Sequence, residues 1–334
     1  MRPSITTTLL PEFDGKVGRT CETIVKASLI YFGILGTFGN VNILVATYRR
    51  KALRTKCCIL LAVLAYCDLF CLLFELLSAF RLLTNSASMF RPQCFWSIGI
   101  YIFLENVEAY MHVAVGIDRL LAICYPMRYR KWRTFPYILT LVFPGVVYGS
   151  ALFTVGATTL DNKYIPVCNP PLAYSSVISG FWNKAEVVIC LITVLLFFST
   201  YWMIFKIAPK QSDSLSKSQL KTHQSIIITL TVNVGAYFIS GVCCAGLIFF
   251  MRITHVNKDI IAEVVTYAVI PGLLSYSINY YVYFWRSPEY QYAFKQQLFC
   301  CCSNYRTETQ TVALVTPNPL PFLKGHSIEV RHSS

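Results

Sequence analysis

One long apolar stretch, residues 94–133, carries its polar side chains at helical spacing. Five of them follow one another at intervals of 4, 3, 4 and 7 and would share one stripe of an α-helix: Tyr101, Glu105, Glu108, His112 and Arg119. From Cys94 to Arg119 such a helix rises roughly 37 Å, enough to cross a hydrocarbon core of roughly 30 Å. Acids and an arginine inside a membrane are costly and persist where they face a protein interior or a watery cavity. The stretch therefore predicts a helix inside a bundle, with its polar stripe turned inward.

The composition excludes a soluble domain of this length. Hydrophobic residues make up 55% of the chain and charged residues 13%, which predicts a polytopic membrane protein. A net charge of +13 is compatible with nucleic-acid binding, but the basic residues fall in short connections between apolar runs, the pattern that sets membrane orientation. We therefore expect membrane lipids, and no nucleic acid, as partners.

Seven apolar runs are each long enough to span a membrane. They cover approximately residues 25–48, 57–80, 94–125, 135–158, 184–207, 222–251 and 260–285. Arg and Lys concentrate in the connections after the first, third and fifth runs, so the positive-inside rule puts the N-terminus outside. The predicted fold is an all-α membrane protein, a bundle of seven transmembrane helices. Residues 1–24 would form the extracellular N-terminus, 25–299 the membrane domain and 300–334 the cytoplasmic tail.

A short segment after the seventh run, Pro288 to Phe299, predicts an amphipathic eighth helix on the membrane surface. Three adjacent cysteines follow it: Cys300, Cys301 and Cys302. In this juxtamembrane position they are candidates for palmitoylation, and the alternative is three unmodified thiols in a reducing cytosol.

Short motifs stand at fixed places in the predicted helices. They are Gly39-Asn40 in the first helix, Leu64 to Asp68 (LAYCD) in the second, Cys94 placed 24 residues before Asp118-Arg119-Leu120 in the third, and Asn279 to Tyr283 (NYYVY) in the seventh. In this order they resemble the GN, LAxxD, Asp-Arg-Tyr and NPxxY marks of the rhodopsin-like G-protein-coupled receptors. Two longer strings, IDRLLAICYPMRYRKW and SYSINYYVYFWRSPEYQYAF, are similar to nematode chemosensory receptors of serpentine class SX.

The resemblance implies a plasma-membrane receptor that binds an extracellular ligand and activates a heterotrimeric G protein. A small environmental chemical is the favoured ligand, and a neuropeptide is the alternative within the same fold. A seven-span channel or proton carrier, with Glu75, Glu105, Glu108 and Asp68 as its relay, is the interpretation from a different class. No nucleophile and base, phosphate loop or metal set is visible in the sequence, so we expect no enzymatic activity.

The resemblance also implies a ligand site in the outer half of the bundle. Its residues would be Tyr101, Glu105, Glu75, Glu186 and Glu263. Tyr101 stands where aminergic relatives hold an aspartate, which disfavours an ordinary monoamine, whereas Glu105 is suited to a cationic or hydrogen-bonding ligand. For the last three acids a structural role and a ligand contact both stay open.

A polar core at mid-membrane, often occupied by sodium in the family, is implied at Asn40, Asp68, Glu108 and Asn279. Apart from this sodium ion no cofactor is expected. Glu108 stands where relatives usually have a small hydroxyl residue. Two carboxylates close together in a low dielectric cannot both ionise cheaply, so one would hold a proton or the two would share a cation. A structural hydrogen-bonded pair is the alternative.

Coupling to the G protein is implied at the cytoplasmic ends of the helices, by Asp118, Arg119, Leu120, Pro126 and Tyr283. The carboxylate of Asp118 would hold the guanidinium of Arg119 in a resting state and release it to a partner; the alternative is a charged pair at the membrane interface. The start of the sixth run, residues 221–224, offers no acid. A second salt bridge common in relatives would then be absent, and basal activity raised.

Two departures from the family pattern concern helix bending and the outer cysteines. Tyr280 replaces the proline of NPxxY, the sixth run has no CWxP and the fifth lacks its usual proline, so the position of activation kinks stays open. Cys94 and Cys168 both face the oxidising side and would form the family's disulfide. Cys21 is then left over, as a free thiol or a competitor for Cys94.

Overall fold

The computed structural model describes residues 17–207, the single positions 231, 235, 238, 239, 242 and 267, and residues 269–298. Residues Met1–Gln297 form one compact unit and Leu298–Ser334 a second, of which only Leu298 is described. Several predictions lie outside the described residues. They concern most of the sixth run, the cytoplasmic tail, Glu263, the three cysteines Cys300 to Cys302 and the side chain of Cys21.

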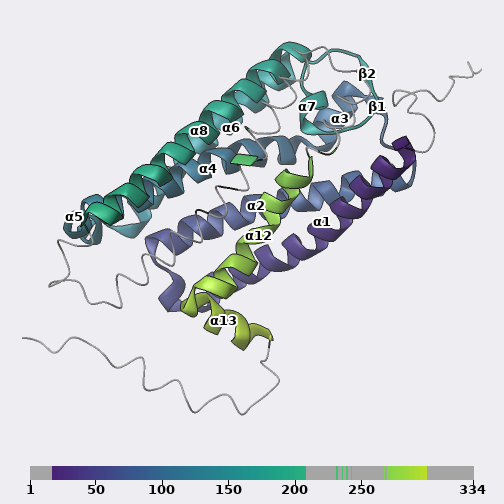
Figure 1. Ribbon diagram of the computed structural model, residues 1–334. Helices are drawn as coiled ribbons and strands as arrows, with labels where there is room; N and C mark the ends of the chain where they lie inside the picture. Colours follow the sequence, from purple (N-terminus) through teal and green to yellow (C-terminus); the bar gives the residue numbers. More distant parts are fainter. Residues whose placement is uncertain are drawn as a thin grey trace, which may run out of the picture. The chain divides into compact units, whose positions relative to one another are not determined.

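Long helices make up most of the described chain (Figure 1). They are α1 (Val17–Arg49), α2 (Lys56–Leu83), α4 (Gly99–Cys124), α6 (Thr134–Thr158), α8 (Ser176–Ile207) and α12 (Val269–Arg286). Among the described residues, four segments are long and apolar enough to cross a membrane: Glu22–Arg49, Lys56–Leu83, Thr134–Thr158 and Ser176–Met203. The all-α membrane class is confirmed, and the number of seven helices stays a prediction.

Short elements connect the long helices. They are η1 (Lys51–Leu53), β1 (Met89–Phe90), α3 (Arg91–Ser97), α5 (Pro126–Lys131), β2 (Tyr164–Ile165), α7 (Pro170–Ala173) and α13 (Pro288–Leu298). Strands β1 and β2 pair antiparallel, with Met89 opposite Ile165. Helix α13 coincides with the predicted eighth helix apart from its last residue, and its contact with a membrane surface stays a prediction.

Three helix boundaries differ from the prediction, and at two of them the structure shows a polar contact that hydropathy does not reveal. The third run is divided at Ile98 into α3 and α4. Helix α1 begins eight residues early, and Glu22 in the added part pairs with Lys26, four residues further on, at 2.6 Å. Helix α8 also begins eight residues early, because Trp182 on its first turns is buried and hydrogen-bonded.

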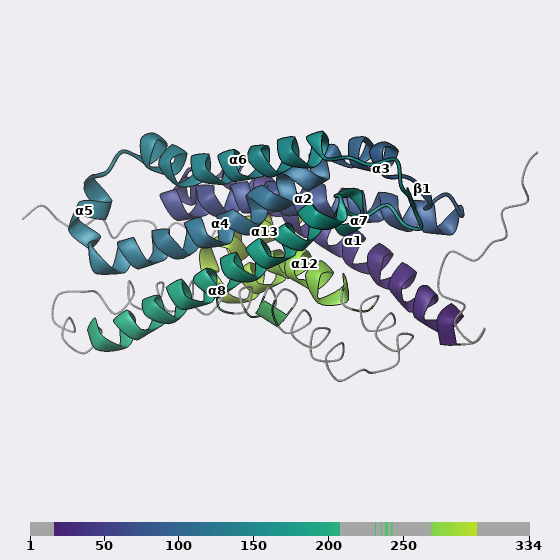
Figure 2. The ribbon, with the colours of Figure 1, turned by 90° about the horizontal axis from the view of Figure 1, so that it is seen from above.

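Helix α4 lies at the centre of the bundle, where it packs against α2, α6 and α8, while α1 packs against α2 and α12 (Figure 1). The inward-facing stripe predicted for α4 is confirmed. Tyr101, Glu108, His112 and Arg119 are buried, and Glu105 is half-buried. Figure 2 shows α5 at one end of α4, and α3 with β1 at the opposite end. Sites at the two ends of the bundle are therefore separated by the length of α4.

The close approach of α1 and α12 requires a glycine. A Cβ atom added at Gly39 would lie 2.6 Å from the Cβ of Tyr280. Tyr280, which stands at the family's proline position, is buried, and its ring lies 4.4 Å from that of Phe294 and 5.6 Å from that of Phe38 between centroids. The missing proline is thus replaced by an aromatic contact between α12, α13 and α1.

Candidate functional site

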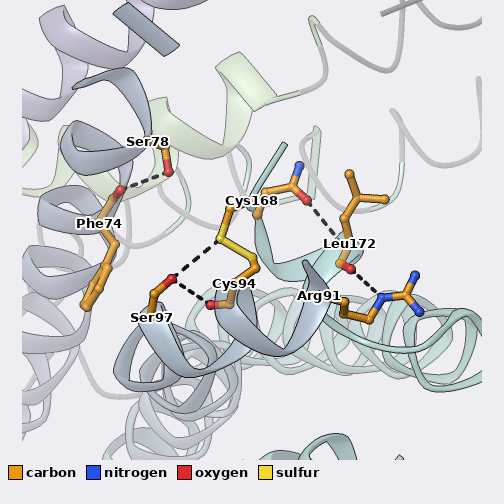
Figure 3. Close-up of a disulfide and its surroundings, with 8 residues drawn as sticks. Phe74, Ser78, Arg91, Cys94, Ser97, Cys168 and Leu172 are labelled. Carbon is orange, nitrogen blue, oxygen red and sulfur yellow. Dashed lines mark hydrogen bonds between the residues drawn. A yellow bond between two sulfur atoms is a disulfide. The ribbon is translucent and has the colours of Figure 1, made fainter. Parts of the chain in front are cut away.

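A disulfide joins Cys94 of α3 to Cys168, in the segment between β2 and α7 (Figure 3). The Ser97 hydroxyl donates to the Cys94 carbonyl oxygen at 2.8 Å and toward Cys168 Sγ at 3.9 Å. Arg91 Nε donates to the Leu172 carbonyl oxygen at 3.1 Å. The predicted pairing of these two cysteines is present, and it ties the connection between α6 and α8 to α3, which directly precedes α4.

Carboxyl groups gather inside the bundle near this end. The Tyr101 hydroxyl, on α4, donates to Glu75 Oε1, on α2, at 2.5 Å, and the Phe74 ring stacks on Tyr101 with 5.7 Å between centroids. Glu105, one turn along α4, lies within electrostatic range of Glu75 and of Glu186 on α8. Glu105 Oε2 is buried and accepts no hydrogen bond from any described residue. Such an oxygen is suited to a donor brought by a ligand.

The structure thus brings together Tyr101, Glu105, Glu75 and Glu186, four of the five residues predicted for the ligand site. Glu263, the fifth, lies outside the described residues.

Three residues at this end escaped the sequence analysis. Asn106, which is fully buried on α4, donates from Nδ2 to the Tyr174 hydroxyl at 3.3 Å and accepts from Trp182 Nε1 at 3.1 Å. Burial raises the pKa of Tyr174 above its ordinary value, so this hydroxyl keeps its proton. The contacts connect α4 to α8 and to the segment beyond the disulfide. The only sign of these contacts in the sequence was the amide side chain of Asn106, next to Glu105 of the acidic stripe.

The predicted polar core lies further along α4. Asn279 Nδ2, on α12, donates to Asp68 Oδ2, on α2, at 2.7 Å, and Asn40 Nδ2, on α1, donates to the Tyr276 carbonyl oxygen at 3.0 Å. Asp68 Oδ1 and Asn40 Oδ1 are buried and accept no hydrogen bond from any described residue. Asn40 on α1 and Asp68 on α2 thus each have one buried oxygen that a cation or a water would satisfy.

Glu108 has a partner that the sequence analysis did not assign. Its Oε1 lies 2.7 Å from His112 Nε2, one turn along α4, and both side chains are buried. Asp68 is within electrostatic range of Glu108. Across the described part of the chain, no three His, Cys, Asp or Glu side chains come close enough to hold a metal ion.

At the opposite end of α4, the buried Asp118 accepts hydrogen bonds on both oxygens. Arg119 donates to Oδ2 from Nε at 2.9 Å and also from a terminal nitrogen. Oδ1 accepts from the hydroxyls of Tyr129, on α5, at 2.9 Å and of Tyr137, on α6, at 3.0 Å. Burial, and then the Asp118 carboxylate, raise the pKa of Tyr129 above its ordinary value, so it stays a donor.

The other residues predicted for coupling lie around this pair. Leu120 is half-buried on α4, and Pro126 is exposed as the first residue of α5. Tyr283 is buried, and its ring stacks on Tyr290 of α13 with 5.1 Å between centroids. Neither Tyr129 nor Tyr137 was predicted.

Comparison with known proteins gives matches of one kind. A family model described as serpentine type 7TM GPCR chemoreceptor Srsx matches residues 33–298. The chain is similar to olfactory receptor 10D1B of Mus musculus, at 29% identity over 45% of this chain and 48% of that receptor. It is also similar to a dopamine D2-like receptor of Drosophila melanogaster, at 27% identity over 53% of this chain and 19% of the receptor.

A third similarity is to the muscarinic acetylcholine receptor gar-2 of Caenorhabditis elegans, at 25% identity over 62% of this chain and 34% of that receptor. The matches span less than half the length of each of these three relatives.

Proposed function

The chain belongs to the serpentine type 7TM GPCR chemoreceptor family Srsx, and from this premise we propose that it binds a small environmental chemical at the disulfide-bonded end of its bundle and activates a heterotrimeric G protein at the α5 end. It is a multi-pass membrane protein. We place it in the plasma membrane with the N-terminus outside, where the Cys94–Cys168 disulfide would meet an oxidising compartment.

One observation carries this proposal: the two ends of α4 hold two chemically different sites. The carboxyl cluster around Glu105 lies at one end, and the Asp118–Arg119 pair lies at the other. A ligand that binds the first site changes the second only if its affinity differs between two conformations of the bundle. Helix α4 belongs to both sites, so a shift of α4 against its neighbours would alter both together.

The chemistry of the outer site favours a ligand with a hydrogen-bond donor or a positive charge. Glu75 already accepts the Tyr101 hydroxyl, whereas Glu105 Oε2 is buried and accepts nothing from the described residues. Leaving a buried acceptor unsatisfied costs about 1–3 kcal/mol, which a donor on the ligand would recover.

The polar core fits a sodium ion, because Asp68 Oδ1 and Asn40 Oδ1 are buried oxygens with no described donor. These two residues, with Asn279 beside them, would hold the ion, and its charge would offset that of the Asp68 carboxylate. We also propose that the cysteines Cys300 to Cys302 carry palmitate.

The proposal is tested with a panel of volatiles, water-soluble metabolites and neuropeptides on cells that express the chain, read by calcium and cyclic nucleotides. The matched variant is Arg119→Ala, which removes the guanidinium without touching the outer site. We expect an active chemical whose signal is lost in Arg119→Ala while its binding stays within about tenfold. Normal signalling by surface-expressed Arg119→Ala would contradict the receptor mechanism, and a response to peptides alone would favour the neuropeptide alternative.

A further inference from the structure

Lys56 is a buried cation in a place that its own helix disfavours. It is the first residue of α2 and is 8% exposed, whereas Lys51 and Arg54 on the same connection are exposed. The N-terminal turn of a helix carries positive partial charge, so an ammonium group there is unfavourable. Burying that group adds a desolvation cost. The position of Lys56 must therefore be due to groups outside α2.

Those groups come from α5 and α6. Lys56 Nζ donates to the carbonyl oxygen of Tyr129, and it lies 4.4 Å from the ring centroid of Tyr129 and 5.4 Å from that of Tyr137. A cation over two aromatic faces is attracted by both, more strongly when it is shielded from water. The hydroxyls of the same two rings donate to Asp118 Oδ1. The tyrosines thus stand between the ammonium of Lys56 and the carboxylate of Asp118.

We propose that Lys56 is a positioning residue that holds α5 against the ends of α4 and α6 and so presents α5 to the cytoplasmic G protein. The identity of this partner rests on the proposed function. Helix α5 has six residues, none of them buried, and a helix of that length has little stability of its own. Its position therefore depends on tethers, and Tyr129 provides two: its hydroxyl to Asp118 and its carbonyl to Lys56.

Without Lys56, one of these tethers is lost and the other persists. The Tyr129 hydroxyl would still reach Asp118, but its carbonyl, near the end of α5 where helical partners run out, would face no cation. Helix α5 should then open more often while the rest of the bundle stays intact. Met127 is an apolar side chain on α5 and is 70% exposed. When α5 opens, the position in which Met127 meets a partner would change as well.

The first measurement is amide hydrogen exchange in residues 125–133 of the purified full-length protein in nanodiscs. Lys56→Met keeps an unbranched side chain only one atom shorter and removes its charge. The matched control is Lys206→Met, because Lys206 Nζ lies 5.0 Å from the ring centroid of Trp202 and both side chains are exposed on α8. We expect exchange in this segment to rise about tenfold in Lys56→Met and to stay unchanged in the control.

The second measurement is nucleotide loading of a purified G-protein heterotrimer by the same nanodiscs without added ligand. Lys56→Met should raise the half-saturating heterotrimer concentration about tenfold and leave the maximal rate unchanged, because Arg119 and Asp118 are intact. Lys56→Arg keeps the charge and donors and should restore both readouts. If Lys56→Met does not fold, Lys56→Gln, which keeps an N–H donor, should show a smaller change of the same sign.

Unchanged exchange in residues 125–133 would overturn the proposal. So would faster exchange with an unchanged heterotrimer requirement, or a fall in the maximal rate alone. If the wild-type protein loads no G protein without ligand, only its ligand-free activity is absent, and the proposed function is judged by the response to an active chemical. The exchange of α5 then decides by itself whether Lys56 positions this helix.

Discussion

Replacing Tyr129 and Tyr137 by phenylalanine tests how the buried Asp118 is satisfied when Arg119 leaves it. Each substitution removes one hydroxyl from Asp118 Oδ1 and keeps the ring that lies near Lys56. In the described structure Asp118 also accepts two bonds from Arg119. Once Arg119 turns toward a partner, the two tyrosines would be the donors that remain from this set. A lost hydroxyl therefore costs more in the active state than in the resting state.

The size of the effect follows from the number of donors left. A hydrogen bond to a charged group contributes about 1.5–3 kcal/mol. If the loss of one hydroxyl costs the active state about 1.4 kcal/mol more than the resting state, basal signalling falls about tenfold. The double variant leaves a buried carboxylate without either hydroxyl in the active state. Its loss should exceed the product of the two single losses, because the two donors share one acceptor.

The assay is ligand-free signalling of each single variant and the double variant, normalised to surface expression. Tyr125→Phe is the matched control, since Tyr125 is 54% exposed at the same end of the bundle; it should signal like the wild type. Higher basal signalling in the double variant would refute the reasoning, because it would mean that the tyrosines restrain the resting state. Strictly multiplicative single effects would refute the shared acceptor.

Three further predictions concern the disulfide, the α1–α12 contact and the acids of α4. Cys94→Ser and Cys168→Ser should each impair surface expression or ligand binding, with the double variant no worse than either single one, because all three remove one bond; additive damage would contradict this. Gly39→Ala should lower the free energy of unfolding by about 1–3 kcal/mol, measured by thermal unfolding in detergent, because its Cβ would lie 2.6 Å from that of Tyr280, whereas Gly180→Ala meets nothing within 4 Å and should not. Glu105→Gln should lower the potency of charged agonists in dose–response curves and leave basal signalling alone, while Glu108→Gln, which alters the contact with His112, should change basal signalling and its dependence on sodium or pH. Equal potency shifts for charged and neutral agonists in both variants, with no altered sodium or pH response, would make this pair merely structural.

Contacts that depend on periodicity along one helix could be predicted from the sequence. The inward stripe of α4 follows from spacing alone, and the pair of Glu108 with His112 lies four residues apart on that stripe. The all-α membrane class follows from composition and run length. The Cys94–Cys168 disulfide and the approach of Asn279 to Asp68 came from the family resemblance, since no spacing rule connects residues so far apart.

Contacts made by short connecting elements could not be predicted from the sequence. Tyr129 and Tyr137 meet Asp118 because α5 turns the chain back toward α6, and the sequence between them shows only a basic, aromatic connection. Lys56 belongs to the basic connection after the first run, whose charges predict the orientation in the membrane, although its side chain is buried. Trp182 lies before the predicted fifth run, residues 184–207, although in the structure it belongs to α8. In each case a tertiary hydrogen bond, invisible to local patterns, decides the position of the side chain.

The expectation of raised basal activity came from the absence of an acid at residues 221–224, which lie outside the described residues. The arrangement around Asp118 gives an independent reason for the same expectation. A buried carboxylate normally opposes the departure of its only cation, because the bare charge is left in a low dielectric. Here two tyrosine hydroxyls donate to Asp118 and would remain when Arg119 departs, and the ammonium of Lys56 lies over both of their rings. The two tyrosines thereby lower the free-energy cost of releasing Arg119, independently of any contact from the sixth run. Ligand-free signalling should therefore depend on these tyrosines.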